Sequence, residues 1–340
     1  MNKNTLIMTL LKGRTIIVLA ILMLFFSMAA DAFFTVPSLL SVSKHVALYG
    51  ILGIGMTYVL VTGGIDLSVG SIVGLSGMVA GYLITNGFTI FGQTIYFSVP
   101  SIVIIAMLIG MFFGFINGVI ITKFTVAPFI ATLGMMYVAR GFANLTSNGA
   151  TFPNLVGKEA LGNTGFEIFG RDIAGFPVAV LILIIIAVIA AVVLRKTPFG
   201  WHILAIGGNN RAARLSGVRV DHDTICVYMF SGVCAAIVGI IATSQLVASH
   251  PMTGNTWEMN AIAAAVLGGT SLFGGVGTIV GTVIGAFIIG VITDGMVMCG
   301  VSEFWQMIIK GGVIVLAVIV DQYQRNLQAR MALMARNASK

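Results

Sequence analysis

One stretch of the chain sets residues that could interact with a polar solute between two long apolar segments. Residues 61–70 read V-T-G-G-I-D-L-S-V-G, so the carboxylate of Asp66 and the hydroxyl of Ser68 follow the paired glycines Gly63 and Gly64. A carboxylate in a membrane is unfavourable unless it faces protein or water, and paired glycines are poor helix formers. Broken helices at membrane depth occur where they pack in protein or line a cavity. The stretch therefore predicts a broken helix beside a solute pathway.

Other polar side chains in or beside apolar segments could hydrogen-bond a neutral polar solute. The predicted pathway comprises Gly63, Gly64, Asp66, Ser68, Asn117, Thr132, Gln245, Glu258 and Asn260. The alternative for each is a structural role, in which a buried polar group caps or cross-links broken helices. A third interpretation makes Asp66 and Glu258 a proton-coupling pair, because acids inside membranes often relay protons.

The sequence lacks the common patterns of enzymes and nucleotide-binding proteins. No G-x-x-x-x-G-K-[ST] loop, H-E-x-x-H, C-x-x-C or G-x-S-x-G occurs, and the glycine-rich run 274–282 has no lysine. His45, His202, His222 and His250 form no cluster in the sequence. We therefore expect no catalytic site, no metal and no cofactor. If ATP drives the protein, another chain must supply the ATPase.

Composition indicates an integral membrane protein. Of the 340 residues, 58% are hydrophobic and only 9% are charged, whereas soluble domains carry roughly a quarter charged residues. The net charge of +7 does not indicate nucleic-acid binding, because the basic residues lie in short loops and tails and form no patch with interleaved aromatics. Membrane lipid is the expected environment.

Ten apolar segments predict an all-α protein with about ten transmembrane helices, some of them broken, in a single domain over 1–340. The segments are 15–30, 45–62, 70–86, 98–122, 126–146, 177–194, 224–247, 258–272, 277–297 and 304–320. The first could also be a signal peptide, since Ala30-Asp31-Ala32 resembles a cleavage site. Glycine pairs four residues apart predict close helix packing, as at Gly70/Gly74, Gly110/Gly114 and Gly281/Gly285.

Lysines and arginines predict the orientation, because they concentrate in cytoplasmic loops. With a cytoplasmic N-terminus, the inside regions are 1–14, 63–69, near 123, 195–223, 273–276 and 321–340. They hold Lys3, Lys12, Arg14, Lys123, Arg195, Lys196, Arg211, Arg214, Arg219, Arg325, Arg330, Arg336 and Lys340. The outside regions hold only Lys44, Lys158 and Arg171. Both termini are therefore expected to be cytoplasmic.

Two polar interruptions separate the apolar segments. Residues 147–176 form an outside loop that could serve as a gate or a platform for an external partner. In the inside loop 195–223, Asn209 suits a helix N-cap, 210–216 a short helix and Gly217 its stop. This basic helix is either part of an ordinary solvated loop or a docking helix for a cytoplasmic protein.

The opening stretch has an echo in the second half of the chain. G-G-I-D-L-S-V-G (63–70) resembles G-G-T-S-L-F-G-G (268–275) at a constant offset of 205, which pairs Gly63 with Gly268. Interrupted apolar segments at corresponding positions of two halves are typical of transporters with internal repeats. The echo therefore favours an internal repeat.

Several motifs together carry a family resemblance over most of the chain. They are V-T-G-G-I-D-L-S-V-G-S (61–71), P-F-I-A-T-L-G-M (128–135) with Arg140-Gly141, A-I-G-G-N-N-R-A-A-R-L-S-G-V (205–218), E-M-N-A-I-A-A-A-V-L-G-G-T-S-L-F-G-G-V-G-T (258–278) and W-Q-M-I-I-K-G (305–311). In these motifs and their order, the sequence resembles the permease subunits of bacterial ABC importers for monosaccharides of the ribose, galactose, arabinose and allose type.

The resemblance implies a ten-helix inner-membrane permease that pairs with a second copy or a sister permease. It implies a periplasmic sugar-binding protein and a cytoplasmic ABC ATPase as partners. The family's coupling segment falls on 205–218, which assigns ATPase coupling to Gly207, Gly208, Asn209, Arg211, Ala212, Arg214 and Gly217. One departure is Asn260, which stands where the family often has aspartate. That departure puts an acidic role at this position in doubt.

The expected function is translocation of a monosaccharide, a ribose-like pentose or a hexose, by alternating access. Related ABC permeases carry branched-chain amino acids, nucleosides or sugar-derived signals, and these remain alternatives. A zwitterion would need paired opposite charges, and Arg140 is the only cation available to Asp66 or Glu258. A proton-coupled secondary transporter is the remaining rival. The sequence does not name the sugar.

Overall fold

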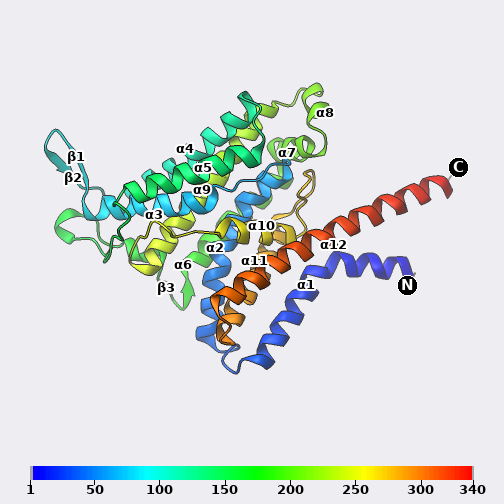
Figure 1. The fold of residues 1–340 in the computed structure, drawn as a ribbon, viewed down its shortest axis with the longest axis horizontal. Helices are drawn as coiled ribbons and strands as arrows, with labels where there is room; N and C mark the ends of the chain where they lie inside the picture. Colours follow the sequence, from blue (N-terminus) through cyan, green and yellow to red (C-terminus); the bar gives the residue numbers. More distant parts are fainter. Residues whose placement is uncertain (1–2, 339–340) are drawn as a thin grey trace.

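A computed structural model describes helices and strands within residues 3–338, and side chains at residues 15–320, 322 and 323. Its helices and strands follow one another along the chain as drawn in Figure 1. They are α1 (Lys3–Ala29), α2 (Val36–Val61), α3 (Val69–Thr85), β1 (Phe88–Ile90), β2 (Gln93–Ile95), α4 (Val99–Lys123), α5 (Pro128–Leu145), β3 (Asp172–Ile173), β4 (Phe176–Pro177), α6 (Val178–Lys196), α7 (Pro198–Gly208), α8 (Asn210–Leu215), α9 (Val220–Leu246), α10 (Trp257–Leu267), α11 (Ile279–Met298) and α12 (Glu303–Ala338), with 3-10 turns at Glu159–Leu161 and Phe166–Phe169.

Every apolar segment predicted from the sequence overlaps one of these helices. Within the described part of the chain, six helices are long and apolar enough to cross a membrane: α2, α4, α6, α9, α11 and Glu303–Val320 of α12. Thr15–Ala29 of α1, together with α3 and α10, is apolar but shorter. The chain is therefore a mostly helical, multi-pass membrane protein, and ten full spans stay a prediction. The two small hairpins, β1–β2 and β3–β4, lie between helices.

Proline marks the start of four helices. α2, α4, α5 and α7 each carry proline at the first or second helical position. The fixed φ of proline suits the first turn, where its missing N–H is not needed for a helical hydrogen bond. These four helix starts are therefore local properties of the sequence.

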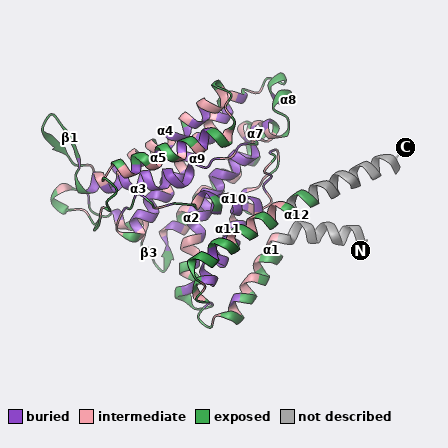
Figure 2. Cartoon of the chain, in the orientation of Figure 1, coloured by how far each residue is buried: buried purple, intermediate pink, exposed green. Residues whose placement is uncertain are grey.

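Helix α2 forms the centre of the molecule, as the buried residues in Figure 2 show. In its most apolar window 89% of the residues are buried, whereas the corresponding window of α12 is 6% buried. α2 packs against α6, α9, α10 and α11. The remaining apolar surface of α12 is available to lipid or to another chain.

Small residues allow the helices to approach closely where the sequence predicts it. On α4, Cβ atoms added at Gly110 and Gly114 would overlap the backbone carbonyls of Gly232 and Tyr228 on α9. The pairs at Gly70/Gly74 and Gly281/Gly285 likewise face backbone or side-chain atoms that a methyl group would overlap. The prediction of close packing at these glycine pairs is confirmed.

Loops gather on two opposite faces. The α8 face comprises α7, α8 and loops 62–68 and 268–278; here Gly275 N–H donates to the Val61 carbonyl (2.8 Å). The hairpin face comprises β1–β2 and residues 147–177. A β-bridge between Phe152 and Ser249 joins it to the segment that follows α9. Figure 1 places α7 and α8 at the upper right and β1–β2 at the far left.

This grouping agrees with the predicted topology. Residues 63–69, 195–223 and 273–276, all predicted to be inside, lie together on the α8 face. Lys123 joins them, because its Nζ lies 3.8 Å from Asp221 Oδ2. Which face is cytoplasmic stays a prediction, and side chains 1–14 and 324–340, which carry several of the charges behind it, lie outside the described residues.

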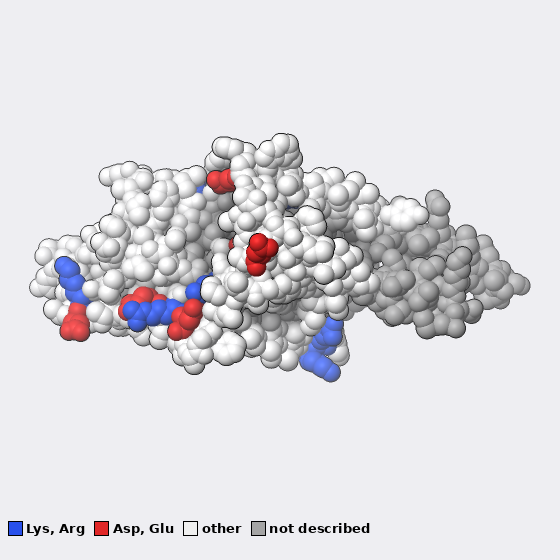
Figure 3. All heavy atoms as spheres, turned by 90° about the horizontal axis from the view of Figure 1, so that it is seen from below, with Lys and Arg blue, Asp and Glu red and all other residues white. Residues whose placement is uncertain are grey.

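The surface in Figure 3 carries few charges for its area. Seen from below, acidic and basic side chains gather in a few small groups and leave broad uncharged areas between them. Such uncharged area is expected where helices face lipid.

Candidate translocation site and coupling surface

The chain breaks at the paired glycines that the sequence singles out. α2 ends at Val61, and the N–H groups of Gly63 and Gly64 donate to the carbonyls of Leu60 (2.8 Å) and Val59 (3.1 Å). Gly63 has φ +81°, in the left-handed region that glycine enters without strain. The turn redirects the chain toward α3, which begins at Val69.

Asp66 lies in this turn with no exposed surface, and both of its oxygens accept hydrogen bonds. Oδ1 accepts from the Ser68 N–H (3.0 Å) and the Ser68 hydroxyl (2.6 Å). Oδ2 accepts from the hydroxyl of Ser231 on α9 (2.9 Å). A buried carboxylate is stabilised when its oxygens are satisfied in this way. In this conformation Asp66 faces protein and ties the broken helix to α9.

Two more predicted pathway residues extend this cluster. The amide of Asn117 on α4 donates to the Ser68 hydroxyl (2.9 Å). Thr132 on α5 donates to the carbonyls of Pro128 (2.9 Å) and Ile65 (3.2 Å). Polar side chains from α4, α5 and α9 therefore hold loop 62–68 in place.

Glu258 and Asn260 lie in the first turns of α10. Both are buried, and a Cβ added at Gly70 on α3 would overlap the Glu258 carboxylate. An acidic residue in the first turn also interacts favourably with the helix dipole. The missing side chain at Gly70 thus lets α10 approach α3.

Arg140 on α5 lies beside this contact. Its guanidinium donates to three backbone carbonyls, those of Gly70 (3.2 Å), Thr253 (3.0 Å) and Pro251. It also interacts electrostatically with Glu258. Arg140 therefore joins α3 to the segment 251–253 that precedes α10.

The loop after α10 repeats the backbone form of the loop after α2. Gly269 has φ +90°, and the N–H groups of Gly269 and Thr270 donate to the carbonyls of Val266 and Ala265 (both 2.9 Å). The equivalent of Gly63 is thus Gly269. The sequence echo pairs Gly63 with Gly268, and this prediction is wrong by one residue at the ends of α2 and α10.

The two loops meet at α7. A Cβ at Gly207 would overlap the Val61 carbonyl and the Gly275 N–H. Gly208 and Gly217 have open space around them among the described residues, and Gly217 has φ +87°. Of the glycines assigned to the coupling segment, Gly207 is the one at which the packing leaves no room for a side chain.

Helix α8 forms as the sequence predicts. The Asn209 side chain accepts from Ala212 N–H (3.0 Å), which confirms the predicted cap, and Gly217 follows the last turn. Asn209, Ala212 and Arg211 are exposed. Arg214 is exposed too, and it pairs with Asp221 at the start of α9 (2.5 Å).

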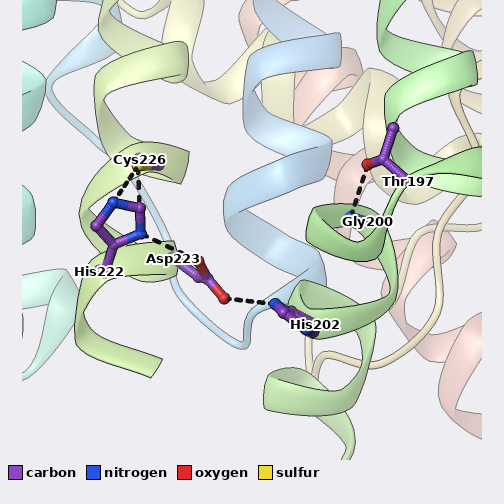
Figure 4. A network of polar contacts seen from close by, with 6 residues as sticks. All are labelled: Thr197, Gly200, His202, His222, Asp223 and Cys226. Atoms are coloured by element: carbon purple, nitrogen blue, oxygen red, sulfur yellow. Dashed lines mark hydrogen bonds and ion pairs between the residues drawn. The ribbon is translucent and has the colours of Figure 1, made fainter. Parts of the chain in front are cut away.

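Figure 4 shows how α7 is fixed to α9. Asp223, on α9 and largely buried, accepts from His202 of α7 (3.0 Å) and lies 3.2 Å from His222 Nδ1. Cys226 lies one turn beyond His222, with its sulfur 3.9 Å from the ring. The short helices of the α8 face are therefore attached to a long helix of the core.

Sequence comparison assigns the chain to a known family. A family profile described as the permease component of the branched-chain amino acid transport system matches residues 38–318. The chain belongs to this permease family.

Similar proteins are named for sugar import. The ribose import permease protein RbsC of Bacillus subtilis (strain 168) is 41% identical over 306 residues, covering 89% of this chain and 90% of that protein. The L-arabinose ABC transporter permease protein AraH of Azospirillum brasilense is 36% identical over 321 residues, covering 94% and 90%. The xylose transport system permease protein XylH of Haemophilus influenzae is 33% identical over 363 residues, covering 90% and 94%. No solved structure matches the chain.

Most of the predicted pathway residues lie around α3 in this permease, but Gln245 does not. It lies at the end of α9 and lines a cavity of about 180 Å³ on the hairpin face, with Glu167 and Arg171. Its amide nitrogen is buried and has no hydrogen-bond partner among the described residues. Gln245 is therefore separate from the Asp66 cluster.

Two residues that hold the permease's broken helix were not on the predicted list. Arg140 carried a signal, because a cation within an apolar segment requires partners. Ser231 carried none, because serine is common in membrane helices and its partner is 165 residues away in sequence. Among the described side chains, no group of three or more His, Cys, Asp or Glu could hold a metal ion.

Proposed function

We propose that this permease imports a monosaccharide, a ribose-like pentose or a hexose, by alternating access across the bacterial inner membrane. The observation that carries the proposal is the near full-length similarity to proteins named for ribose, arabinose and xylose transport. A separate ABC ATPase drives the cycle, and a periplasmic sugar-binding protein delivers the sugar. The permease pairs with a second copy or a sister permease, and its termini and α8 face are cytoplasmic.

The site's electrostatics favour a neutral solute over an amino acid. The Asp66 oxygens already accept from Ser68 and Ser231, and the guanidinium of Arg140 already donates to three carbonyls. Recognition of a zwitterion would need a free cation and a free anion. The Asp66 carboxylate and the Arg140 guanidinium are engaged in holding loops, so among the described residues no free cation faces a zwitterion's carboxylate, which supports sugar over the family's branched-chain amino acids.

The pathway itself lies along α3, α5 and α10 in this proposal. Asp66, Ser68 and Asn117 are fully buried here. They therefore support the wall of the pathway from behind and do not contact the sugar in this conformation. Glu258 and Asn260 are slightly exposed and provide the polar contacts nearest to a passing sugar. Weak contacts suffice, because the binding protein supplies the affinity.

Uptake into proteoliposomes tests this function. The permease is reconstituted with the ATPase and the binding protein encoded beside it, and uptake of labelled ribose, xylose, arabinose and leucine is compared. We expect ATP-dependent uptake of one of the sugars. Leucine uptake alone would contradict the sugar proposal. Sugar accumulation by the permease alone, driven only by a pH gradient, would contradict ATP-driven import.

Helix α8 is the proposed ATPase docking surface. Leu215 is 85% exposed and Trp201 63% exposed on this face, beside the exposed cations Arg211 and Arg214. Exposed apolar residues rimmed by polar groups are typical of protein interfaces. The outer loop 147–176 would face the binding protein.

Arg211 allows a cleaner test of docking than Arg214, because Arg214 also holds α8 to Asp221. We expect Arg211→Glu to weaken ATPase co-purification at least tenfold and to leave the permease's melting temperature unchanged, since charge complementarity contributes strongly to such interfaces. Lys196→Glu, an exposed cation outside α8, is the control. Equal losses in both variants, or none in either, would contradict docking through α8.

A further inference from the structure

A cavity of about 420 Å³ lies beneath α8, inside a single copy of the permease. Its walls come from the Gly63–Gly64 turn, the end of α4, the 125–128 loop, α8 and the start of α9. Its volume falls within the roughly 300–1,000 Å³ typical of small-molecule sites. Glu258 and Asn260 do not belong to its lining.

One wall of the cavity carries a buried hydroxyl without a partner. Tyr228 on α9 is fully buried, and its hydroxyl has no hydrogen-bond partner in the described part of the chain. A Cβ added at Gly64 would overlap this hydroxyl, so the glycine turn leaves it room at the cavity wall. A buried hydroxyl without a partner is unfavourable by itself, and such groups call for an occupant that bonds them.

The remaining lining mixes polar groups with apolar side chains such as Ile121, Val126 and Val220. Arg214 and Asp221 form an ion pair at the cavity (2.5 Å), and Lys123, outside the lining, has its Nζ 3.8 Å from the other oxygen of Asp221. The Asp221 carboxylate is therefore already engaged. Hydroxyl groups and one amide complete the polar lining: Thr62, Thr122, Thr125, Thr224 and Asn210. Donors and acceptors placed around a neutral ion pair suit a ligand with several hydroxyl groups and no net charge.

We propose that this cavity binds a small neutral polyhydroxy ligand of the monosaccharide class. With the α8 face cytoplasmic, as the proposed function has it, the ligand is the imported sugar once it has accumulated inside. The ligand displaces the Gly63–Gly64 turn enough for one of its hydroxyls to bond Tyr228, while Asn210 and the Arg214–Asp221 pair bond others.

Occupancy of the cavity acts on the docking helix. Asn210 and Arg214 belong to α8, and the Arg214–Asp221 ion pair links α8 to α9. A ligand that bridges Tyr228 to these residues therefore restrains α8 against the core. Accumulated sugar would in this way slow the ATPase-driven cycle, because a ligand favours the conformation that it binds more tightly.

Binding to the purified permease tests the site directly. Titration calorimetry on the full chain in detergent, with ribose, xylose, arabinose, glycerol and ribose 5-phosphate as separate probes, should show saturable binding of a neutral pentose. Tyr228→Phe should weaken it at least tenfold without lowering the melting temperature of the ligand-free protein. Thr224→Val is a second cavity variant with the same expectation. Tyr82→Phe, on α3 beside Phe152 of the hairpin face, is the control.

Several results would overturn the proposal. They are no saturable binding, tighter binding of ribose 5-phosphate than of ribose, or equal affinity in the wild-type protein and both cavity variants. These binding measurements need no transport, so they stand even if reconstituted uptake fails and the proposed function with it.

Reconstituted uptake then tests regulation. Vesicles preloaded with the unlabelled sugar should show initial uptake at least twofold slower than empty vesicles. Tyr228→Phe should abolish this slowing and leave uptake into empty vesicles unchanged. Equal slowing in the wild-type protein and Tyr228→Phe would contradict regulation through the cavity, and so would the absence of slowing in the wild-type protein.

Discussion

The loops after α2 and α10 have the same backbone form but are held in different ways. Each begins with a glycine at positive φ, Gly63 and Gly269, that closes the preceding helix. Each then uses a side-chain oxygen to accept the N–H two residues further on: Asp66 from Ser68, and Ser271 from Phe273 (both 3.0 Å).

The difference lies in what the accepting side chain can still do. The Asp66 carboxylate also accepts from Ser231, so the first loop is tied to α9, and through Ser68 to Asn117 on α4. The single hydroxyl of Ser271 shapes its own loop, which is joined to its neighbours through backbone, as in the Gly275–Val61 bond. The carboxylate therefore cross-links helices, whereas the hydroxyl forms a turn.

The largest expected effect comes from breaking the junction that both loops share. In Gly207→Val the new side chain overlaps the Val61 carbonyl and the Gly275 N–H, so both loops must move. We expect a destabilisation of about 3 kcal/mol or more, seen as loss of monodisperse protein in size-exclusion chromatography. Gly208→Val is the control, because that position is open. Similar losses for both variants would contradict the junction.

The second prediction removes the carboxylate of the first loop. Asp66→Ala leaves the Ser68 N–H and the Ser231 hydroxyl without their acceptor, which should destabilise the protein by about 2–4 kcal/mol. Asp66→Asn should cost less, about 1 kcal/mol, since its amide oxygen accepts from Ser68 and its NH₂ donates to Ser231. Melting temperatures of the purified variants give this order.

The same variants separate a structural role of Asp66 from a pathway role. Uptake is normalised to the amount of folded permease, with Asp172→Asn on the hairpin face as the control. A purely structural Asp66 leaves normalised uptake of Asp66→Asn unchanged. A pathway role reduces transport more than expression.

The smallest expected effect belongs to the second loop. Ser271→Ala loses one bond within its turn and should destabilise the permease by about 0.5–1.5 kcal/mol. Ser68→Ala should have a larger effect, because its hydroxyl also donates to Asp66 and accepts from Asn117. A larger loss in Ser271→Ala than in Ser68→Ala would reverse the comparison of the two loops.

Features set by neighbouring residues were predictable from the sequence. The short helix α8 follows from Asn209 as its cap and Gly217 as its stop, and the break after α2 follows from Gly63 and Gly64. Caps and turns form within a few residues, so their signals are local. The echo of the two loops was also visible in the sequence. Gly63 corresponds to Gly269 at the helix end, an offset of 206, whereas Asp66 corresponds to Ser271 in the turn, an offset of 205.

Contacts between distant residues were not predictable in this way. Asp66 accepts a hydrogen bond from Ser231 on α9. Arg140 donates to the carbonyls of Gly70 on α3 and of Thr253 before α10. Gln245 lies away from both contacts. A hydrogen bond requires atoms about 3 Å apart, and sequence spacing does not fix that distance between separate helices. The sequence thus identified the polar residues as candidates, but it did not predict which of them contact one another.

By itself the sequence determined that the chain is a membrane protein, where its apolar helices lie, where two of them break and which short helix is capped. Its composition, periodicity and local turn chemistry suffice for these, because each depends on residues close together in the chain. Tertiary structure decided that Asp66 is enclosed, that Gly207 joins both loops and that Tyr228 lines a cavity beneath α8. The packing of small residues against backbone sets how closely the helices approach, and this approach determines which polar groups meet.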